Sequence, residues 1–289
     1  MTARDLMQGW LQRQLPPEHW QWLEERNAAG AATPEKDLFI TLGLIPRKLG
    51  KADLDLTADD LAAAERVQPG WSPQGWSVDG TARVLTLLQT VAGRNDFPER
   101  FRQLCRTADV AEAIAFYRGL ILYPSPEALE PQAAEGVRSN MRAIFEAVAH
   151  NNPYPRLYFD ESRWNHMVLK ALFVDSRLHP IQGLDERANA ELAQMLRDYA
   201  HERWAAGRPV SPELWRCVGP FAQDEAALAD LDQAARSSDP NEQAAAALAL
   251  SVSPSPLAAE RLAAMHELAA QIADGTLTWD VLSARLDAA

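Results

Sequence analysis

The stretch RSNMRAIFEAVAHNNPYPRLYFDESRWNHMVLKALF, residues 138–173, decides the fold class. Its apolar side chains recur every three or four residues, which is the period of α-helices that pack by one face. One stripe comprises Val137, Met141, Ile144, Phe145 and Val148, and the next comprises Trp164, Met167, Val168, Ala171 and Leu172. Between them, HNNPYP at residues 150–155 is too rich in Asn and Pro to continue a helix, so we expect it to cross between two helices.

Helix starts are marked along the rest of the chain by capping side chains. Ser, Thr or Asp stands before a proline at residues 33–35, 125–127, 211–213 and 239–240, a pattern typical of a cap followed by proline in the first turn. The acidic run DLDLTADD at residues 53–60 lacks the glycine and the terminal Glu of a calcium loop, so we interpret it as a further helix start. About a dozen capped helices joined by short turns predict an all-α fold.

The arrangement of these helices is open to two interpretations. Helix pairs recur at about 40 residues, the spacing of HEAT and armadillo units. We therefore expect an irregular α-solenoid of helical hairpins, with a compact orthogonal helical bundle as the alternative. Residues 1–221 form the expected helical body, and residues 222–289 form a C-terminal extension that resembles helical repeats.

Composition and charge restrict the partners of the chain. With 40 acidic and 28 basic residues the formal net charge is −12, which disfavours binding to nucleic acid or to anionic membranes. The apolar runs are far shorter than a bilayer span, so we predict no membrane insertion. Cys105 and Cys217 are far apart in sequence, and the N-terminal residues have no apolar leader. Both features indicate a cytoplasmic protein with free thiols.

Two further segments carry unusual residues. WSPQGWS at residues 71–77 places two tryptophans in a turn, and we expect them to pin the loop to the core. PRKLGK at residues 46–51 gathers Arg47, Lys48 and Lys51 in an otherwise acidic chain. These three cations either bind a small anion or pair with acidic groups of the same protein, and the second interpretation is the more conservative.

Candidate ligand-binding residues lie on two helices of the central segment. Ser162, His166 and Lys170 share one helical face, with Asn165 at its edge, and a covered His–Lys pair makes a base or a nucleophilic amine. A solvated polar face is the alternative. On the later helix, Asp198 and His201 are spaced to form a carboxylate–histidine dyad, and Trp204 follows one turn later. His201 could instead bridge to a neighbouring helix. We predict neither a metal site nor a cofactor, because no motif for either is present.

Several long phrases resemble the EboA family of metabolite-trafficking proteins. They are LGLIPRKLGKADL (42–54), RTADVAEAIAFYRGL (106–120), AAEGVRSNMRAIFEAVA (133–149), NPYPRLYFDESRWNHMVLKALF (152–173) and DYAHERWAAGRPVSPELWR (198–216). The resemblance implies a cytoplasmic product of a small gene cluster that assists the biosynthesis of secondary metabolites or their movement towards the periplasm. It carries over no catalytic residues. In the family pattern Gln is as common as His at position 166, which shifts weight to Asn165 and Lys170.

These observations together favour a non-enzymatic helical binding or adaptor protein. Its expected partners are a secondary metabolite or a precursor of one, and other proteins of the same pathway. The alternative is an enzyme that acts on an aromatic or isoprenoid-like metabolite through Lys170, His201 and Asp198. Lys170 carries the sharpest hypothesis, namely that it faces an interior pocket.

Overall fold

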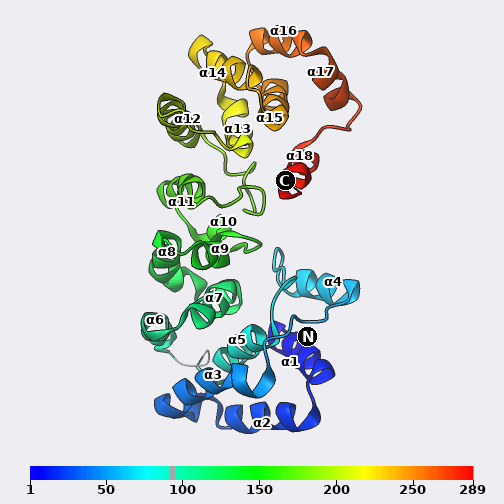
Figure 1. Ribbon diagram of the computed structural model, residues 1–289. Coiled ribbons are helices and arrows are strands. Elements are labelled where there is room, and N and C mark those ends of the chain that lie inside the picture. Colours follow the sequence, from blue (N-terminus) through cyan, green and yellow to red (C-terminus); the bar gives the residue numbers. More distant parts are fainter. Residues whose placement is uncertain (92–94, 289) are drawn as a thin grey trace. The chain divides into compact units, whose positions relative to one another are not determined.

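The computed structural model describes residues 1–91 and 95–288, and within these ranges the chain is all-α (Figure 1). The described residues contain no strand, and an isolated β-bridge joins Asp53 and Ser77. The α-helices are α1 (Ala3–Gln14), α2 (Pro17–Asn27), α3 (Glu35–Leu49), α4 (Ala58–Val67), α5 (Val78–Thr90), α6 (Phe97–Thr107), α7 (Val110–Arg118), α8 (Glu130–Arg138), α9 (Arg142–Ala149), α10 (Tyr154–Tyr158), α11 (Glu161–Phe173), α12 (Ala190–Ala205), α13 (Trp215–Val218), α14 (Glu225–Ala235), α15 (Pro240–Ser251), α16 (Pro256–Ala264), α17 (His266–Ala273) and α18 (Trp279–Asp287). Short 3-10 helices are η1 (Gly30–Ala32), η2 (Leu120–Leu122), η3 (Pro126–Leu129), η4 (Pro212–Leu214) and η5 (Gly219–Phe221).

The chain divides into two compact units, Met1–Arg163 and Trp164–Ala289. The division falls in the first turn of α11. The predicted all-α class is confirmed, whereas the solenoid and the sequence division at residue 221 remain predictions.

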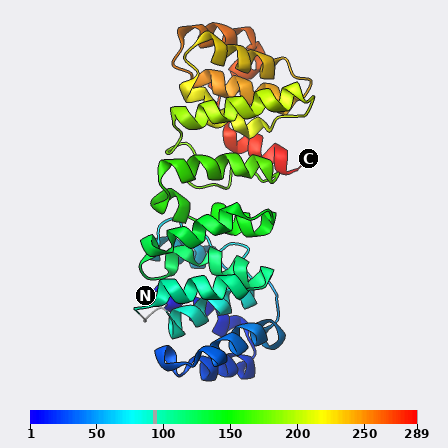
Figure 2. The same cartoon turned by 90° about the vertical axis from the view of Figure 1, so that its left-hand side faces the viewer.

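Unit 1 is built around α5. This helix is buried on nearly all sides and packs against α1, α3 and α7 (Figures 1 and 2). From α7 the packing continues to α9, and from α9 to α8. The last pair approaches closely at Gly136, where an added Cβ would lie 2.6 Å from a methyl carbon of Val148. The absence of a side chain at this position therefore allows α8 to pack on α9.

Unit 2 is organised around α15, which packs against α13, α14, α16, α17 and α18. Its sequence PNEQAAAALALS supplies small side chains on every face, and all residues from 244 to 250 are buried. Small side chains let neighbouring helices approach the α15 backbone. At Gly219 an added Cβ would lie 2.6 Å from the Ala249 carbonyl oxygen, so this position also requires glycine.

Capping signals predict some helix starts and misplace others. Thr57 and Asp60 form the expected capping box of α4, and Asp239 accepts a hydrogen bond from the Asn241 N–H at the start of α15. At Ser125 and Ser211 the following proline begins a 3-10 turn without a side-chain cap. At residues 33–35 the helix begins one position later than expected, with proline itself at the N-cap.

The first apolar stripe quoted above does not lie on one helix, so this part of the prediction is wrong. The chain leaves the helix at residues 139–141, and Met141 is 49% exposed at the start of α9. The Ser139 hydroxyl accepts a hydrogen bond from the Met141 N–H at 3.1 Å, a local bond that competes with helical hydrogen bonding. The break lets α8 and α9 pack against each other. The second stripe is buried on α11 as predicted.

Candidate ligand-binding site

One face of α7 lines a cavity in unit 1. Ala111, Ile114, Ala115 and Arg118 stand at positions i, i+3, i+4 and i+7 and therefore share that face. The cavity has a volume of about 250 Å³ and a mainly apolar wall. We call it the apolar chamber, and its lining residues are Lys51, Trp76, Ser77, Asp79, Gly80, Ala111, Ile114, Ala115 and Arg118.

The outer wall of the apolar chamber is held by paired backbone segments. The Leu54 N–H donates to the Trp76 carbonyl oxygen at 2.8 Å, and the Val78 N–H donates to the Ala52 carbonyl oxygen at 2.8 Å. Gln14 of α1 braces the same segment through hydrogen bonds to the Asp53 carbonyl oxygen and the Asp55 N–H. These bonds place Lys51 and Trp76, from separate loops, on one chamber.

A second cavity adjoins the first, since both are lined by Trp76, Ile114 and Arg118. This polar chamber has a volume of about 200 Å³. Its remaining lining residues are Ser72, Gln74, Ala143, Glu146, Ala147, His150, Asn151 and Asn152. The two loops singled out in the sequence, WSPQGWS and HNNPYP, therefore meet across one cavity.

Aromatic packing and a buried amide hold these loops in place. The rings of Trp10, Trp71 and Trp76 form a chain with centroid distances of 5.5 and 6.1 Å, and all three side chains are buried. The predicted pinning of the 71–77 loop to the core is therefore confirmed. In the other loop, the Asn152 side-chain amide donates to the carbonyl oxygens of Tyr117 and Ala147. Such internal bonding makes the walls preformed, as is common for small-molecule sites.

Arg118 lies where the two chambers meet. Its partly buried guanidinium donates to the Gly75 carbonyl oxygen at 3.2 Å and forms no ion pair with the described residues. Burial lowers the pKa of this guanidinium, and the Glu146 carboxylate opposes the decrease. An arginine keeps its charge at neutral pH even so, and the site therefore presents a cation with spare hydrogen-bond donors.

Both acidic groups of the chambers are paired with arginines outside them. Asp79 binds Arg83 one turn along α5 at 2.7 Å, and the Ser77 hydroxyl donates to the same carboxylate. Glu146 binds Arg142 at 2.6 Å on α9. These pairings leave the positive charges of Arg118 and of the exposed Lys51 without an acidic partner in the described chain.

The polar chamber contains residue types that also occur in hydrolytic triads, namely Ser72, His150 and Glu146. The His150 Nδ1 lies 4.0 Å from the Glu146 Oε1, which is beyond hydrogen-bonding distance. Ser72 forms no hydrogen bond with its hydroxyl in the part of the chain described. Nucleophilic catalysis requires a linked nucleophile and base, and Ser72 has no such link among the described residues.

The sequence-predicted residues of α11 lie in unit 2. Asn165 is buried, and its amide exchanges two hydrogen bonds with Asn189, at 2.8 and 3.2 Å. Asn189 is in turn the N-cap of α12. His166 is exposed and Lys170 is half-buried, neither is without a partner, and Lys170 lines neither chamber. Asn165 thus has a structural role that joins α11 to the start of α12.

The residues predicted on α12 also bridge helices. His201 places its Nε2 2.7 Å from Asp230 of α14, and Arg197 binds the same carboxylate at 2.7 Å. Asp198 is exposed and accepts a hydrogen bond from Gln194. Trp204 stacks on Trp215 with a centroid distance of 5.6 Å. His201 therefore forms the helix bridge and does not pair with Asp198.

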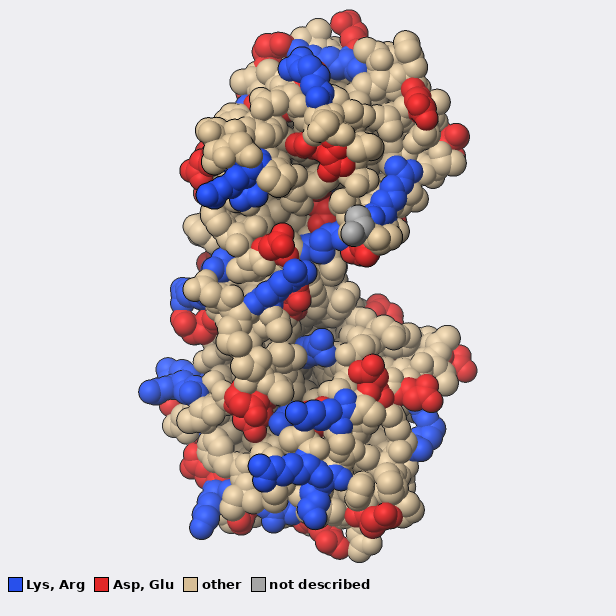
Figure 3. All heavy atoms as spheres, in the orientation of Figure 1, with Lys and Arg blue, Asp and Glu red and all other residues tan. Residues whose placement is uncertain are grey.

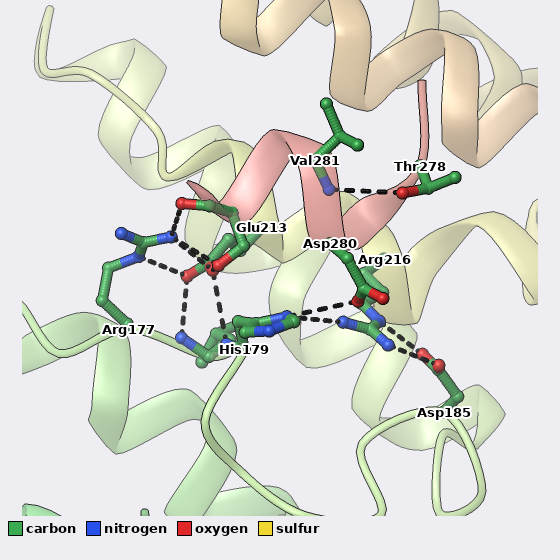
Figure 4. A network of polar contacts seen from close by, with 10 residues as sticks. Arg177, His179, Asp185, Glu213, Arg216, Thr278, Asp280 and Val281 are labelled. Carbon is green, nitrogen blue, oxygen red and sulfur yellow. Dashed lines mark hydrogen bonds and ion pairs between the residues drawn. The ribbon is translucent and has the colours of Figure 1, made fainter. Parts of the chain in front are cut away.

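A denser polar network surrounds Arg177 in unit 2 (Figure 4). The buried Glu213 carboxylate binds this guanidinium at 2.9 Å and accepts hydrogen bonds from the Leu178 and His179 N–H groups. Arg177 also donates to the carbonyl and hydroxyl oxygens of Ser283 and pairs with Asp287. Burial raises the pKa of Glu213, but the bonds from Arg177 and the two N–H groups outweigh it and lower this pKa overall.

The network extends to a second arginine. Arg216 binds Asp185 through two hydrogen bonds of 2.6 Å and approaches His179 Nδ1 at 3.3 Å (Figure 4). The same histidine nitrogen lies 4.0 Å from Asp280 at the start of α18. The bonds of Arg177, Glu213 and Arg216 join the 175–189 loop, the 212–218 segment and α18. We therefore assign this network to stability.

The cations of the PRKLGK segment lie in different surroundings. Arg47 and Lys48 are exposed in the last turn of α3, and Lys51 lies on the apolar chamber. The expected intramolecular pairing is not formed, since none of the three has an ion pair within the described ranges. On the face drawn in Figure 3, basic and acidic side chains alternate in small groups.

The described residues contain neither a group of side chains that could bind a metal ion nor a membrane-spanning helix. No group of three or more His, Cys, Asp or Glu side chains there could hold a metal ion. None of the helices that the structure describes combines the length and apolar character of a bilayer crossing.

Comparison with known proteins agrees with the resemblance noted in the sequence. The profile of the family described as "Metabolite traffic protein EboA" matches residues 3–219. The chain belongs to the EboA family. No curated protein and no solved structure matches it. Every residue that lines the two chambers lies inside the EboA match, whereas helices α14 to α18 lie outside it.

Sequence reasoning missed the α7 contribution to this EboA-family site. The signal was present, because residues 111, 114, 115 and 118 form a helical face of small and apolar residues that ends in an arginine. Nothing in the sequence, however, shows that this face lies against the loops at 71–77 and 150–155.

Proposed function

We propose that the protein is a non-enzymatic binding protein that assists the biosynthesis or trafficking of a secondary metabolite, and that the two chambers hold this metabolite. The family description supports a role in metabolite traffic. The observation that carries the proposal is the convergence of α7 with three separate loops on adjoining chambers of about 250 and 200 Å³. Together they have the size typical of small-molecule sites.

The binding protein works, in this proposal, in the cytoplasm and hands the metabolite to other proteins of its pathway or towards export. Preformed walls suit this role, because a rigid site binds without ordering its own loops first. A carrier requires reversible binding and no chemistry, which agrees with a Ser72 hydroxyl that forms no hydrogen bond to a base among the described residues.

Affinity purification followed by metabolite extraction tests the proposal. The wild-type protein and Ala111→Phe are isolated from the native producer, and small molecules released from each are compared by mass spectrometry. Ala111 is exposed and borders the apolar chamber, so the larger ring fills the chamber while leaving the core intact. We expect a compound that copurifies with the wild type and is depleted in the variant. Equal amounts in both samples would exclude these chambers as the site.

A further inference from the structure

The charges around the two chambers indicate which kind of molecule fits them. Their two acids, Asp79 and Glu146, are each bound by an arginine that lies outside the lining. Their two cations, Arg118 and Lys51, have no acidic partner among the described residues. In a chain of formal net charge −12, this leaves a local excess of positive charge at a cavity.

The position of Arg118 indicates where an anionic group of a ligand would bind. Its guanidinium uses one donor on the Gly75 carbonyl oxygen, and the planar group offers five donors in total. Arginine binds carboxylate, sulfonate or phosphate oxygens with paired, charge-assisted hydrogen bonds. Arg118 lines the polar chamber and also the apolar chamber, whose lining includes Trp76, Ile114 and Ala115.

We propose, as a refinement that rests on the function proposed above, that the ligand is an amphipathic anion. Its carboxylate, sulfonate or phosphate group binds Arg118, and its apolar ring or hydrocarbon part occupies the apolar chamber against Trp76 and Ile114. Lys51, on the same chamber, adds long-range attraction. The asymmetry of the two chambers sets the orientation of the bound molecule.

A matched pair of fluorescent probes tests the charge requirement. 8-Anilinonaphthalene-1-sulfonate carries the anion, and N-phenyl-1-naphthylamine has the same ring system without it. Each is titrated against the wild type, Arg118→Gln, Arg118→Lys and Ala111→Phe. We expect Arg118→Gln to weaken sulfonate binding about tenfold, as loss of a charged hydrogen bond does, and to change binding of the neutral probe less than about twofold. Arg118→Lys keeps the charge and should lie between wild type and Arg118→Gln.

Controls separate this inference from the proposed function. Arg208→Gln removes an exposed arginine beside a separate hollow of unit 2 and should change neither titration. Ala111→Phe should weaken both probes. If Ala111→Phe weakens both while Arg118→Gln affects them equally or not at all, the chambers bind ligand and the anion assignment is wrong. If the wild type binds neither probe, or Ala111→Phe has no effect on either, both the inference and the proposed site fail.

Discussion

Arg118 in unit 1 and Arg177 in unit 2 are both partly buried, yet their surroundings differ. Arg177 binds the buried Glu213, the exposed Asp287 and two oxygens of Ser283. Arg118 has one backbone carbonyl as a hydrogen-bond partner and forms no ion pair with the described residues. Arg118 therefore keeps hydrogen-bond donors available that Arg177 has already used.

A segment rich in polar and aromatic side chains therefore need not be a binding site, because those side chains can be used in contacts within the protein. The segment of unit 2 that holds most of the conspicuous side chains uses them to join helices, as His201 with Asp230 and Asn165 with Asn189 show. The cations of the two chambers in unit 1, Arg118 and Lys51, form no ion pair with the described residues. Four measurements test this difference between structural side chains and candidate binding side chains.

The largest loss of stability is expected when Arg177 is replaced. Arg177→Gln leaves the Glu213 carboxylate buried without its counter-charge, and such losses destabilise proteins by about 3–5 kcal/mol. Arg118→Gln removes one hydrogen bond to a backbone carbonyl and should change the free energy of unfolding by less than about 1 kcal/mol. Urea unfolding followed by circular dichroism measures both. Equal losses in the two variants would remove the distinction between a structural and a binding arginine.

The next effect concerns pH. Because the folded protein lowers the pKa of Glu213, this carboxylate stabilises the fold above the pKa of the unfolded chain, about 4.3, and the stabilisation is lost as the pH falls through the lower folded value. The free energy of unfolding of the wild type should therefore fall below about pH 4.3 more steeply than that of Glu213→Gln. The exposed partner offers a control, since Asp287→Asn should retain the steep fall. If the free energy of unfolding changed with pH in the same way for the wild type and Glu213→Gln, Glu213 would not be the carboxylate responsible for the loss of stability.

A smaller effect is expected at the buried amide pair. Asn165→Ala removes two hydrogen bonds and leaves the Asn189 side chain without its buried partner, which should destabilise the protein by about 2 kcal/mol. Gln74→Ala, at an exposed position of the polar chamber, should change stability by less than about 0.5 kcal/mol. Thermal unfolding provides the comparison. An unchanged melting temperature in Asn165→Ala would return Asn165 to the list of binding candidates.

The smallest expected effect is a gain of stability when Glu242 is replaced by glutamine. Burial raises the pKa of Glu242 on α15, the Ser237 hydroxyl partly offsets this, and one carboxylate oxygen has no hydrogen-bond partner. A raised pKa means that the charged form opposes folding at neutral pH, so Glu242→Gln should stabilise the protein by about 0.5 kcal/mol at pH 7. The gain should vanish below about pH 4, where both side chains are neutral. A loss of stability at pH 7 would show that the charge is solvated.

Much of the helical content follows from sequence periodicity and capping chemistry. The Thr57 capping box, the Asp239 cap and the buried stripe of α11 lie as predicted. The break between α8 and α9 was missed because one serine side chain outweighs an apolar pattern that is itself continuous. Local propensity could not reveal this, since the break is favoured by the packing of the two helices on each other.

The site was only partly accessible from the sequence. Lys51, the tryptophan loop and the Asn-rich loop each stood out separately, and all three line the chambers. Their convergence on α7 is a tertiary property, set by contacts such as the backbone pairing of residues 52–54 with 76–78. Conversely, the partner of His201 lies 29 residues further along the chain, at a distance where sequence spacing has no predictive value.

The bonds from Arg177 to α18 also determine the order in which unit 2 can be completed. They join residues 106 and 110 positions apart, so the surroundings of Glu213 are finished only after residues 279–287 have been synthesised. Contacts of such long sequence separation form late, because the chain loses loop entropy before it gains them. During synthesis, at about 5–20 residues per second, the Arg177–Glu213 pair therefore lacks the bonds from Arg177 to Ser283 for roughly 4 to 14 seconds after Glu213 is added. In that interval unit 2 is the more exposed to chaperones and proteases, while unit 1 already has all of its residues.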